Sequence, residues 1–421
     1  MIKINKFTEP RGILKLEQIL ERRRAIQNNN ISVVSKILKD IKKNKNKALI
    51  KYEKKFSNND RIKPSLTEIN RAIRSLNPRV KKAIDYAYNR IFKFHSLQKV
   101  QNINYKDKLN NNLQYRSIPI KKVGVYVPAN LPSTLLMNAI PAKIARVKKI
   151  ILANPRFNKK LNPAVIYAAR KLGIKEIYSI GGAQAIGSLT YIQKVDKIVG
   201  PGNIYVAKAK KEVFGEVGVE GMVAGPSEIT VVADKKSEIK NVITSLIAQA
   251  EHDVNSQCII ISKDVKVLKE IKNLIKKNLK NLPRKKIAEE SLKKNGLLIH
   301  AKNDKNLIDI INIIAPEHVE LNIVKHKKYL NKIVNAGSIC TGKFSAMAVT
   351  DYNVGTNHVL PTMRSARFSS GLNVSDFYKK ISYINLSKKG IEVIGKQAIT
   401  LAEYEKLEGH AQSIKSRIRS K

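Results

Sequence analysis

The stretch that decides the fold lies at residues 121–154 and reads KKVGVYVPANLPSTLLMNAIPAKIARVKKIILAN. Residues 123–127 form a short apolar run with the composition of a buried strand. A helical pattern over residues 138–147 follows, and it leads into a second strand-like run at residues 149–153. A strand, a helix and a strand in this order predict a βαβ unit with parallel strands.

The same alternation continues to residue 279, with short connections that contain Gly, Pro and Asn. The further runs are, in chain order, 164–172, 176–180, 183–191, 197–199, 204–213, 229–233, 239–250, 258–262 and 265–279. Alternation of this kind is typical of parallel sheets covered by helices, so the predicted fold class is α/β. We expect the ligand crevice at the carboxyl ends of the strands.

Helical patterns flank this region, and the length of 421 residues favours two or more domains. Residues 38–101 are helical in pattern and carry few strand signals. The tail from Ile391 has an apolar helical stripe that must be buried against something. The stripe consists of Ile391, Ile394, Ala398, Leu401 and Ala402.

The composition is strongly basic, with a net charge of +47 and a pI near 10.1. Such a charge would ordinarily indicate a nucleic-acid-binding protein. The excess of Lys, Asn and Ile is spread along the chain, however, and basic runs such as residues 42–47 lack interleaved aromatic residues. This pattern favours incidental surface basicity. A basic nucleic-acid-binding protein remains the alternative.

The cysteine content and the apolar runs bear on the compartment. Cys258 and Cys340 lie in apolar strand-like runs, too few and too far apart for a thiolate metal site. The N-terminus has no hydrophobic signal core, and no run approaches the roughly 18 apolar residues that a membrane-spanning helix needs. We therefore expect a soluble, cytoplasmic protein without a membrane segment.

The pair Glu317-His318 is the first candidate for chemistry, within the run APEHVE at residues 315–320. A carboxylate stands beside an imidazole directly after a proline that ends an apolar helical stretch. Such a pair can remove protons from a water and from a substrate hydroxyl. An unperturbed imidazole with a pKa near 6.5 suits proton removal around neutral pH. The alternative is an ordinary helix start.

Two further segments combine imidazole with an amide or a carboxylate. Gln249 and His252 are three residues apart at the end of an apolar helical run, so a helix would direct both to the same side. Asp351 and His358 stand in a polar segment that contains Gly355 and has little reason to be core.

The helical tail carries a third segment, with Glu405 and His410. Five residues on a continuous helix are about 140° apart, so these two could meet one ligand only if Gly409 breaks the helix. Four of the seven His thus lie in acid- or amide-bearing segments, while His95, His300 and His326 have plainer surroundings.

Imidazole with carboxylate or amide oxygen, and without thiolate, is the ligand set of a catalytic zinc. A divalent metal is therefore the first cofactor to expect. The alternative is four unrelated capping or surface histidines.

The chain contains no Gly-x-Gly-x-x-Gly fingerprint. Gly181-Gly182 and Gly200-Pro201-Gly202 follow strand-like runs and precede helices, which suits a backbone turn near a phosphate. A tight turn between a strand and a helix is the more common explanation.

Eight runs span most of the chain: VGVYVP at 123–128, LMNAIPAK at 136–143, GGAQAI at 181–186, GPGN at 200–203, AGPSE at 224–228, QAEH at 249–252, PEH at 316–318 and GTNHVLPT at 355–362. In sequence and in order, these runs resemble the motifs of the histidinol dehydrogenase family.

The resemblance implies the last steps of histidine biosynthesis: oxidation of L-histidinol to L-histidine through the aldehyde, using two NAD and a water. It places zinc on Gln249, His252, Asp351 and His410. The metal would hold the imidazole and amino group of histidinol rather than carry electrons.

The resemblance also assigns the remaining site residues. His318 would take the alcohol proton, and Glu317 would activate the water. The substrate contacts fall on Ser227, Gln249, His252, His318, Asp351, His358, Glu405 and His410, and the NAD contacts on Tyr126, Gln184 and Asn203.

For the architecture, the resemblance implies two incomplete Rossmann-like parallel-sheet domains with helical N-terminal and C-terminal segments. The predicted segments are an N-terminal helical segment at 1–24, an α/β domain with the zinc ligands and bases at 25–125 plus 228–376, an α/β domain with the NAD contacts at 126–227, and a helical tail at 377–421. The tail would pack on a partner subunit and deliver Glu405 and His410 to the neighbour's site, which makes the expected assembly a homodimer with shared active sites.

The chain departs from the family pattern at two places. The turn after Pro128 is shorter, and the family's Ser-Pro-Glu-Ala run appears here as residues 345–348, Ser-Ala-Met-Ala. Neither change touches a residue assigned to zinc or to base chemistry.

Overall fold

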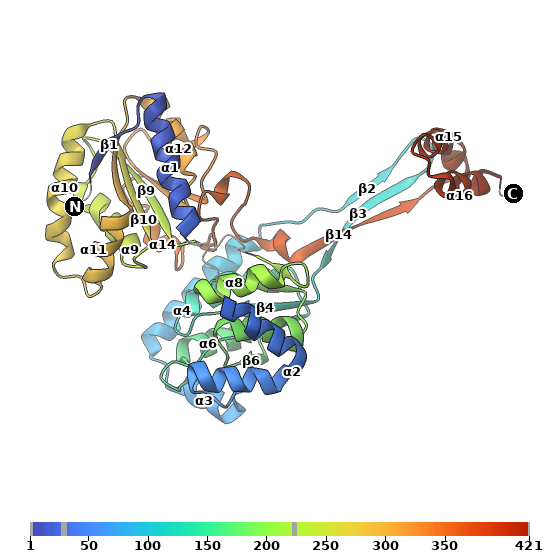
Figure 1. The fold of residues 1–421 in the computed structure, drawn as a ribbon, viewed down its shortest axis with the longest axis horizontal. Coiled ribbons are helices and arrows are strands. Elements are labelled where there is room, and N and C mark those ends of the chain that lie inside the picture. Colours follow the sequence, from blue (N-terminus) through green and yellow to red (C-terminus); the bar gives the residue numbers. More distant parts are fainter. Residues whose placement is uncertain (1–2, 27–31, 221–224, 420–421) are drawn as a thin grey trace. The chain divides into compact units, whose positions relative to one another are not determined.

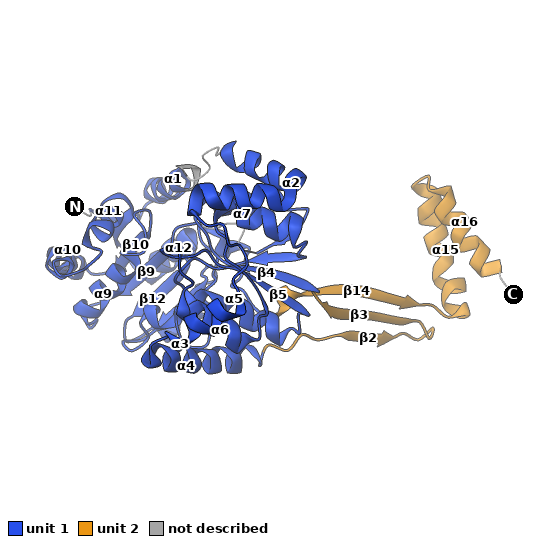
Figure 2. Ribbon diagram, turned by 90° about the horizontal axis from the view of Figure 1, so that it is seen from below, with its two compact units in different colours: residues 1–97, 121–373 blue, residues 98–120, 374–421 orange. Residues whose placement is uncertain are grey.

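The structure is a computed structural model that describes residues 3–26, 32–220 and 225–419. The chain divides into two compact units, Met1–Leu97 with Lys121–Asn373, and Gln98–Ile120 with Val374–Lys421 (Figure 2). The four segments predicted from the sequence follow other boundaries, and their assignment to zinc, NAD and a partner stays a prediction.

The first unit contains a six-stranded parallel sheet of order β1-β11-β10-β9-β12-β13. Its strands are β1 (Ile4–Lys6), β9 (Glu228–Ala233), β10 (Gln257–Ser262), β11 (Gly296–His300), β12 (His318–Asn322) and β13 (Ser338–Thr341). One core joins it to α9 (Ile239–Ala250), α10 (Val265–Leu279) and α11 (Lys285–Asn295), and a second core joins it to α1 (Pro10–Ile26) and α12 (Asp304–Ile314). Helices therefore cover both faces, as Figure 1 shows.

The same unit contains a five-stranded parallel sheet of order β6-β5-β4-β7-β8. Its strands are β4 (Lys122–Tyr126), β5 (Lys149–Ala153), β6 (Glu176–Tyr178), β7 (Lys197–Val199) and β8 (Gly218–Val219). The connecting helices are α5 (Pro132–Ile144), α6 (Pro163–Leu172), α7 (Gly182–Gly187), which continues into a π-helical turn at Ser188–Ile192, and α8 (Ile204–Val213). The predicted βαβ unit is β4-α5-β5, and the α/β prediction is confirmed.

The helical stretch predicted at residues 38–101 is present as α2 (Ser32–Ser57), α3 (Leu66–Arg74) and α4 (Pro78–His95). Residues of α2 share a core with the five-stranded sheet and with α7 and α8. Two short helices, α13 (Lys327–Leu330) and α14 (Met347–Thr350), follow β12 and β13. The segment predicted as helical at 1–24 begins with a strand, because β1 adds to the edge of the six-stranded sheet beside β11.

The second unit is a three-stranded antiparallel sheet of order β14-β3-β2 followed by two helices. Its elements are β2 (Ile103–Lys106), β3 (Asn112–Pro119), β14 (Tyr378–Asn385), α15 (Lys388–Tyr404) and α16 (Glu408–Arg419). The sequence predicted the helices but not the strands, whose polar, largely exposed residues lack the buried-strand pattern.

The apolar stripe of the tail is only partly covered in the single chain. Gly395 lets α16 approach α15, because a Cβ at this position would lie 2.9 Å from Cγ2 of Ile414. Ala402 is buried, whereas Ile394 and Leu401 remain exposed.

None of the helices in the part of the chain that the structure describes has the length and apolarity to span a bilayer.

Candidate active site

Glu317 and His318 lie at the amino end of β12, in the interior of the first unit. Helix α12 ends at Ile314, Ala315 takes a left-handed conformation with φ 45°, and the strand begins at His318. Both side chains are buried. The predicted helix end before Pro316 is confirmed, and the alternative of a helix start is wrong, because the pair opens a strand.

Glu228, at the start of the adjacent strand β9, holds Glu317 through reciprocal hydrogen bonds. The Glu228 N–H donates to Oε2 of Glu317 over 2.9 Å, and the Glu317 N–H donates to Oε2 of Glu228 over 3.4 Å. Burial raises the pKa of Glu317 well above its usual range, and the nearby Glu228 and Asp351 carboxylates raise it further. Burial also raises the pKa of Glu228 to about 7.

The imidazole of His318 is held from both sides. Its Nδ1 is 3.3 Å from Oγ of Ser338 on β13, and its Nε2 is 3.8 Å from Oε1 of Glu317. Burial lowers the pKa of His318 to about 3, with smaller contributions from His358 and His252. The prediction of an ordinary imidazole pKa is therefore wrong for the chain alone, in which His318 is neutral at physiological pH.

Asp351 and His358 are brought together by the turn that follows α14. The Nδ1 atom of His358 is 2.8 Å from the carbonyl oxygen of Asp351. Burial lowers the pKa of His358 to about 4, and the neighbouring His252 lowers it further. Burial also raises the pKa of the Asp351 carboxyl to about 7. Three imidazoles, those of His252, His318 and His358, thus lie close enough to affect one another's protonation.

Gln249 and His252 stand at the carboxyl end of α9. Gln249 is buried in the last turn, whereas His252 lies two residues beyond the helix, in a turn closed by its N–H to the Gln249 carbonyl over 3.2 Å. Arg284 donates to the His252 carbonyl over 3.2 Å. Burial of the imidazole ring lowers the pKa of His252.

The predicted zinc ligands fit a metal by their donor chemistry. Oε1 of Gln249 is buried, and no described residue donates a hydrogen bond to it. An orphaned buried amide oxygen is a group that a cation would satisfy. The described residues contain no group of three or more His, Cys, Asp or Glu arranged to hold a metal. One of the predicted ligands is an amide, and His410 belongs to the second unit.

Ser227 precedes β9 and is half-buried, and its carbonyl accepts a hydrogen bond from the Gln257 N–H over 2.9 Å. Ser227, Glu317 and His318 therefore stand at the amino ends of strands of the six-stranded sheet. The expectation of a ligand crevice at carboxyl ends is wrong for these residues.

The predicted NAD contacts lie at the carboxyl ends of the five-stranded sheet. Tyr126 is the buried last residue of β4, and its hydroxyl accepts a hydrogen bond from the Gly182 N–H over 3.4 Å. Gln184 is buried in α7, which follows β6. Asn203 is exposed after β7, and its Oδ1 caps α8 by accepting from the Tyr205 and Val206 N–H groups.

Glu405 and His410 lie in the second unit, and both are exposed in the single chain. The helix break between them is at Lys406, which has φ 59°, and not at Gly409, which lies inside α16. The helix is therefore interrupted between the two residues, although not at Gly409, the position considered from the sequence.

Sequence reasoning missed two buried carboxyls that touch predicted site residues, Glu53 and Glu228. Glu228 stood inside a quoted motif and could have been singled out. Glu53 sits in a Lys-rich helical segment whose pattern gives no such signal.

Comparison with known proteins places the chain. Residues 20–418 match the family described as Histidinol dehydrogenase. This chain belongs to the histidinol dehydrogenase family. It is 56% identical to a histidinol dehydrogenase of Pelagibacter ubique over 429 residues, which cover 100% of both chains. It is 39% identical to histidinol dehydrogenase 1 of Trichormus variabilis, with 98% of each chain covered.

A solved structure gives the same result at the level of the fold. The crystal structure of histidinol dehydrogenase from Elizabethkingia anophelis superposes with a TM-score of 0.89 at 35% identity, covering 99% of this chain and 98% of that one. These findings support a histidinol dehydrogenase function, which makes the protein an oxidoreductase of histidine biosynthesis.

Within this histidinol dehydrogenase fold, one sequence departure has a structural explanation. Met347 stands where the family pattern has a carboxylate, and its side chain is buried in the core that contains α9 and α10. Its N–H donates to Oε2 of Glu320 over 3.2 Å. The apolar side chain at this position contributes to the core rather than to the site.

Proposed function

We propose that the protein catalyses the NAD-dependent four-electron oxidation of L-histidinol to L-histidine through the aldehyde, with zinc. The observation that carries the proposal is the buried Glu317-His318 pair at the start of β12, with Asp351 near Glu317 and with His358 and His252 near His318. The family assignment supplies the substrate.

His318 is proposed to remove the alcohol proton. A neutral imidazole that donates from Nδ1 to Oγ of Ser338 keeps Nε2 unprotonated, and Nε2 is then the basic atom. The lowered pKa keeps the ring neutral at physiological pH, so the imidazole has an unprotonated nitrogen that can accept the alcohol proton.

Glu317 is proposed to activate the water that attacks at the aldehyde level. A carboxylate whose pKa is raised by burial accepts a proton more readily than an exposed one. The Glu228 N–H holds Oε2, which leaves Oε1 on the side of His318. The two bases therefore share one small volume.

Gln249, His252, Asp351 and His410 would hold the zinc, and Ser227, His358 and Glu405 would contact the substrate. When bound, the metal supplies charge and orientation for the imidazole and amino group of histidinol.

Tyr126, Gln184 and Asn203 are proposed to contact NAD, which accepts the electrons of both oxidations when bound. The task of these residues is to align the cofactor with the carbinol carbon.

NADH formation with L-histidinol tests this proposal, measured before metal stripping, after it, and after zinc return. We expect about two NADH per histidinol, loss of turnover on stripping and recovery with zinc. A folded, metal-loaded protein without turnover would contradict the proposal.

We further propose a homodimer in which the second unit serves the partner's site. Its sheet and helices expose apolar side chains that a second copy would cover, among them Ile103, Tyr105, Ile384, Leu401 and Tyr404. A mixture of His410→Ala chains with His318→Ala chains should regain activity, because one heterodimer site then has both histidines. A mixture as inactive as its parents would exclude shared sites.

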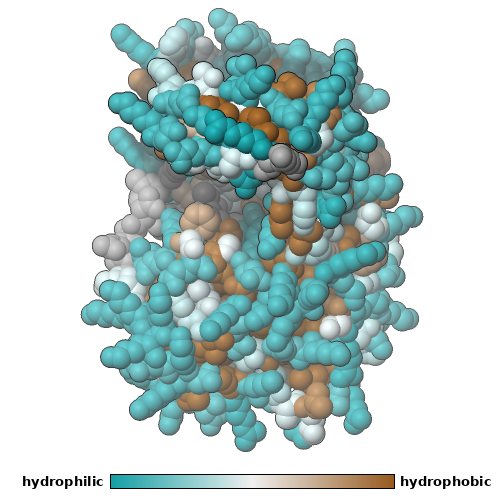
Figure 3. Space-filling model, turned by 90° about the vertical axis from the view of Figure 1, so that its right-hand side faces the viewer, coloured by the Kyte–Doolittle hydropathy of each residue, from teal (hydrophilic) through white to brown (hydrophobic). Residues whose placement is uncertain are grey.

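The alternative is a nucleic-acid-binding protein, suggested by the net charge of +47. Figure 3 shows hydrophilic residues over most of the face in view, with smaller groups of apolar residues between them. Retention of RNA at micromolar affinity in cell-like salt, persisting in Glu317→Gln, would favour this alternative. A cytoplasmic location also remains a proposal, in keeping with two free cysteines buried in strands.

A further inference from the structure

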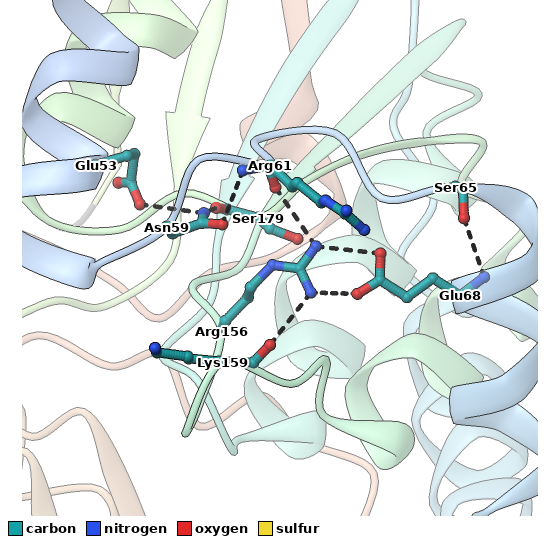
Figure 4. A network of polar contacts seen from close by, with 8 residues as sticks. All are labelled: Glu53, Asn59, Arg61, Ser65, Glu68, Arg156, Lys159 and Ser179. Carbon is teal, nitrogen blue, oxygen red and sulfur yellow. Dashed lines mark hydrogen bonds and ion pairs between the residues drawn. The ribbon is translucent and has the colours of Figure 1, made fainter.

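Glu53, near the end of α2, is a fully buried carboxylate on the cofactor side of the first unit. Its Oε1 accepts hydrogen bonds from the Gly181 N–H over 2.8 Å and from Nε2 of Gln184 over 2.9 Å. On the other side, Nδ2 of Asn59 lies 3.5 Å from Oε2 and donates to the Ser179 carbonyl over 2.6 Å (Figure 4). The carboxylate thus ties α2 to the turn between β6 and α7.

This contact fixes the orientation of the Gln184 amide. A carboxylate only accepts hydrogen bonds, so Gln184 must turn its NH₂ group toward Glu53 and its oxygen away from it. Gly182, which has φ 61°, leaves room for this oxygen, because a Cβ at this position would lie 2.8 Å from Oε1 of Gln184. Gln184 is therefore held with its acceptor end free of the carboxylate.

The same contact uses the backbone donors of the turn. The Gly181 N–H is taken by Glu53 and the Gly182 N–H by the Tyr126 hydroxyl. In a dinucleotide-binding turn such N–H groups face the pyrophosphate. Here the Glu53 carboxyl already accepts from the Gly181 N–H, and in its ionised form it would also repel a phosphate, although burial raises its pKa. The phosphate interpretation of Gly181-Gly182 does not fit, and the tight-turn alternative does.

We propose that Glu53 is a positioning residue for the dinucleotide: it presents the Gln184 amide oxygen as a hydrogen-bond acceptor and excludes phosphate from the Gly181-Gly182 turn. The cofactor would then be recognised at this turn through a hydrogen-bond donor, such as a ribose hydroxyl or a carboxamide. This inference rests on the proposed function, because it takes Gln184 as an NAD contact.

The test is direct NAD binding by calorimetry to Glu53→Met, which keeps the volume and removes both acceptors. We expect the Kd for NAD to rise about tenfold, the worth of one hydrogen bond, while the KM for L-histidinol changes less than about twofold. Glu53→Gln retains an oxygen acceptor and should restore binding to near the wild-type value.

A double-mutant cycle shows whether Glu53 acts through Gln184. If it does, adding Glu53→Met to Gln184→Met should weaken NAD binding no further, because the contact is already lost. Additive effects would overturn the proposal, as would wild-type NAD binding in Glu53→Met or in Gln184→Met. Wild-type NAD binding in Gln184→Met overturns the proposal even where Glu53→Met does not fold.

Glu216→Gln is the matched control. Glu216 pairs with Lys42 of the same helix α2 over 2.8 Å, but it is a surface residue without contact to Gln184. The variant should loosen α2 slightly and leave the Kd for NAD unchanged. Equal losses of NAD binding in this variant and in Glu53→Met would reduce Glu53 to a structural role. Failure of the proposed function is distinguishable, because the wild-type protein would then form no NADH from histidinol.

Discussion

The two parallel sheets of the first unit place their candidate site residues at opposite ends of their strands. In the six-stranded sheet, Ser227, Glu317 and His318 stand at the amino ends, whereas in the five-stranded sheet Tyr126 ends β4 and the other predicted NAD contacts follow β6 and β7. The chemistry differs as well. The amino end gathers buried carboxyls and imidazoles with shifted pKa values, while the predicted NAD contacts at the carboxyl end are neutral.

The direction of the neighbouring helices gives a physical reason for this difference. Helices α9 and α12 run toward the amino edge of the six-stranded sheet, so their carboxyl ends bring partial negative charge next to His252 and His318. Such an edge favours a cation. Helices α5 and α8, which follow β4 and β7, present their amino termini instead, and these favour an anionic dinucleotide, whereas the turn before α7 is occupied by Glu53.

The largest expected effect comes from removing a base at the amino edge. His318→Asn keeps a polar side chain but loses the proton acceptor, so kcat should fall by about 10² to 10⁴. The loss in the free energy of unfolding should be much smaller than the loss in transition-state stabilisation that this fall in kcat represents. Steady-state kinetics and urea unfolding on the same preparation separate the two.

His300→Asn is the matched control on the other edge of the same sheet. His300 ends β11, and its Nε2 is 3.2 Å from the Lys263 carbonyl. This variant should leave kcat within about twofold of the wild type. Equal losses in the two variants would contradict the assignment of chemistry to the amino edge.

A smaller effect is expected from Lys210, a buried cation on the five-stranded side. Its Nζ donates to the carbonyls of Gly200 and Glu220, and burial lowers its pKa to about 8 although the Glu220 carboxylate, which pairs with Lys197, raises it. The unfolded chain binds more protons between about pH 8 and 10.5, so stability should rise with pH in this window, by about 3 kcal/mol.

Chemical denaturation of the wild type and of Lys210→Met at several pH values checks this prediction. The variant lacks the titrating group, so the difference between the two free energies should change across the window and be flat below pH 8. Lys208→Met removes a half-exposed lysine of the same helix, paired with Glu212, and should show no such change. A flat difference for Lys210→Met would mean that the cation is less buried than it is here.

Local patterns predicted the α/β core well. The helices at Ile204–Val213, Ile239–Ala250 and Val265–Leu279 and the strand at Lys149–Ala153 begin and end at the predicted residues. Each has a clear apolar period of its own, which requires no knowledge of distant contacts. The strands of the second unit were missed because their pairing joins residues 112–119 to 378–385, and no local signal reports it.

The candidate site could be predicted in composition but not in environment. Motifs nominated Glu317, His318 and Asp351 together, and the structure brings them into one region, although their roles stay predictions. The low pKa of His318 depends on burial by elements far away in the chain, which a pattern does not contain. The same holds for Glu53, whose partner Gln184 lies 131 residues away.

The smallest expected effect concerns the pairing of Glu228 with Glu317. Oε1 of Glu228 accepts from the Met363 N–H and Oε2 from the Glu317 N–H, so Glu228→Gln keeps one of these two acceptors, and it keeps the N–H that donates to Oε2 of Glu317. It removes the charge that raises the pKa of Glu317. Burial is the larger cause of the raised pKa of Glu317, and the negative charge of Glu228 adds to it.

In Glu228→Gln the proton should therefore leave Glu317 at a lower pH. The acid limb of the plot of kcat against pH should move to lower pH as a result, and the maximal kcat should change by less than about tenfold. Glu320→Gln, a change at a buried carboxyl of the same strand as His318 that bonds Ser245 instead, should leave the limb in place. A limb that stays fixed in Glu228→Gln would mean that the two carboxyls do not act as a pair, and that burial alone tunes the base at the amino edge.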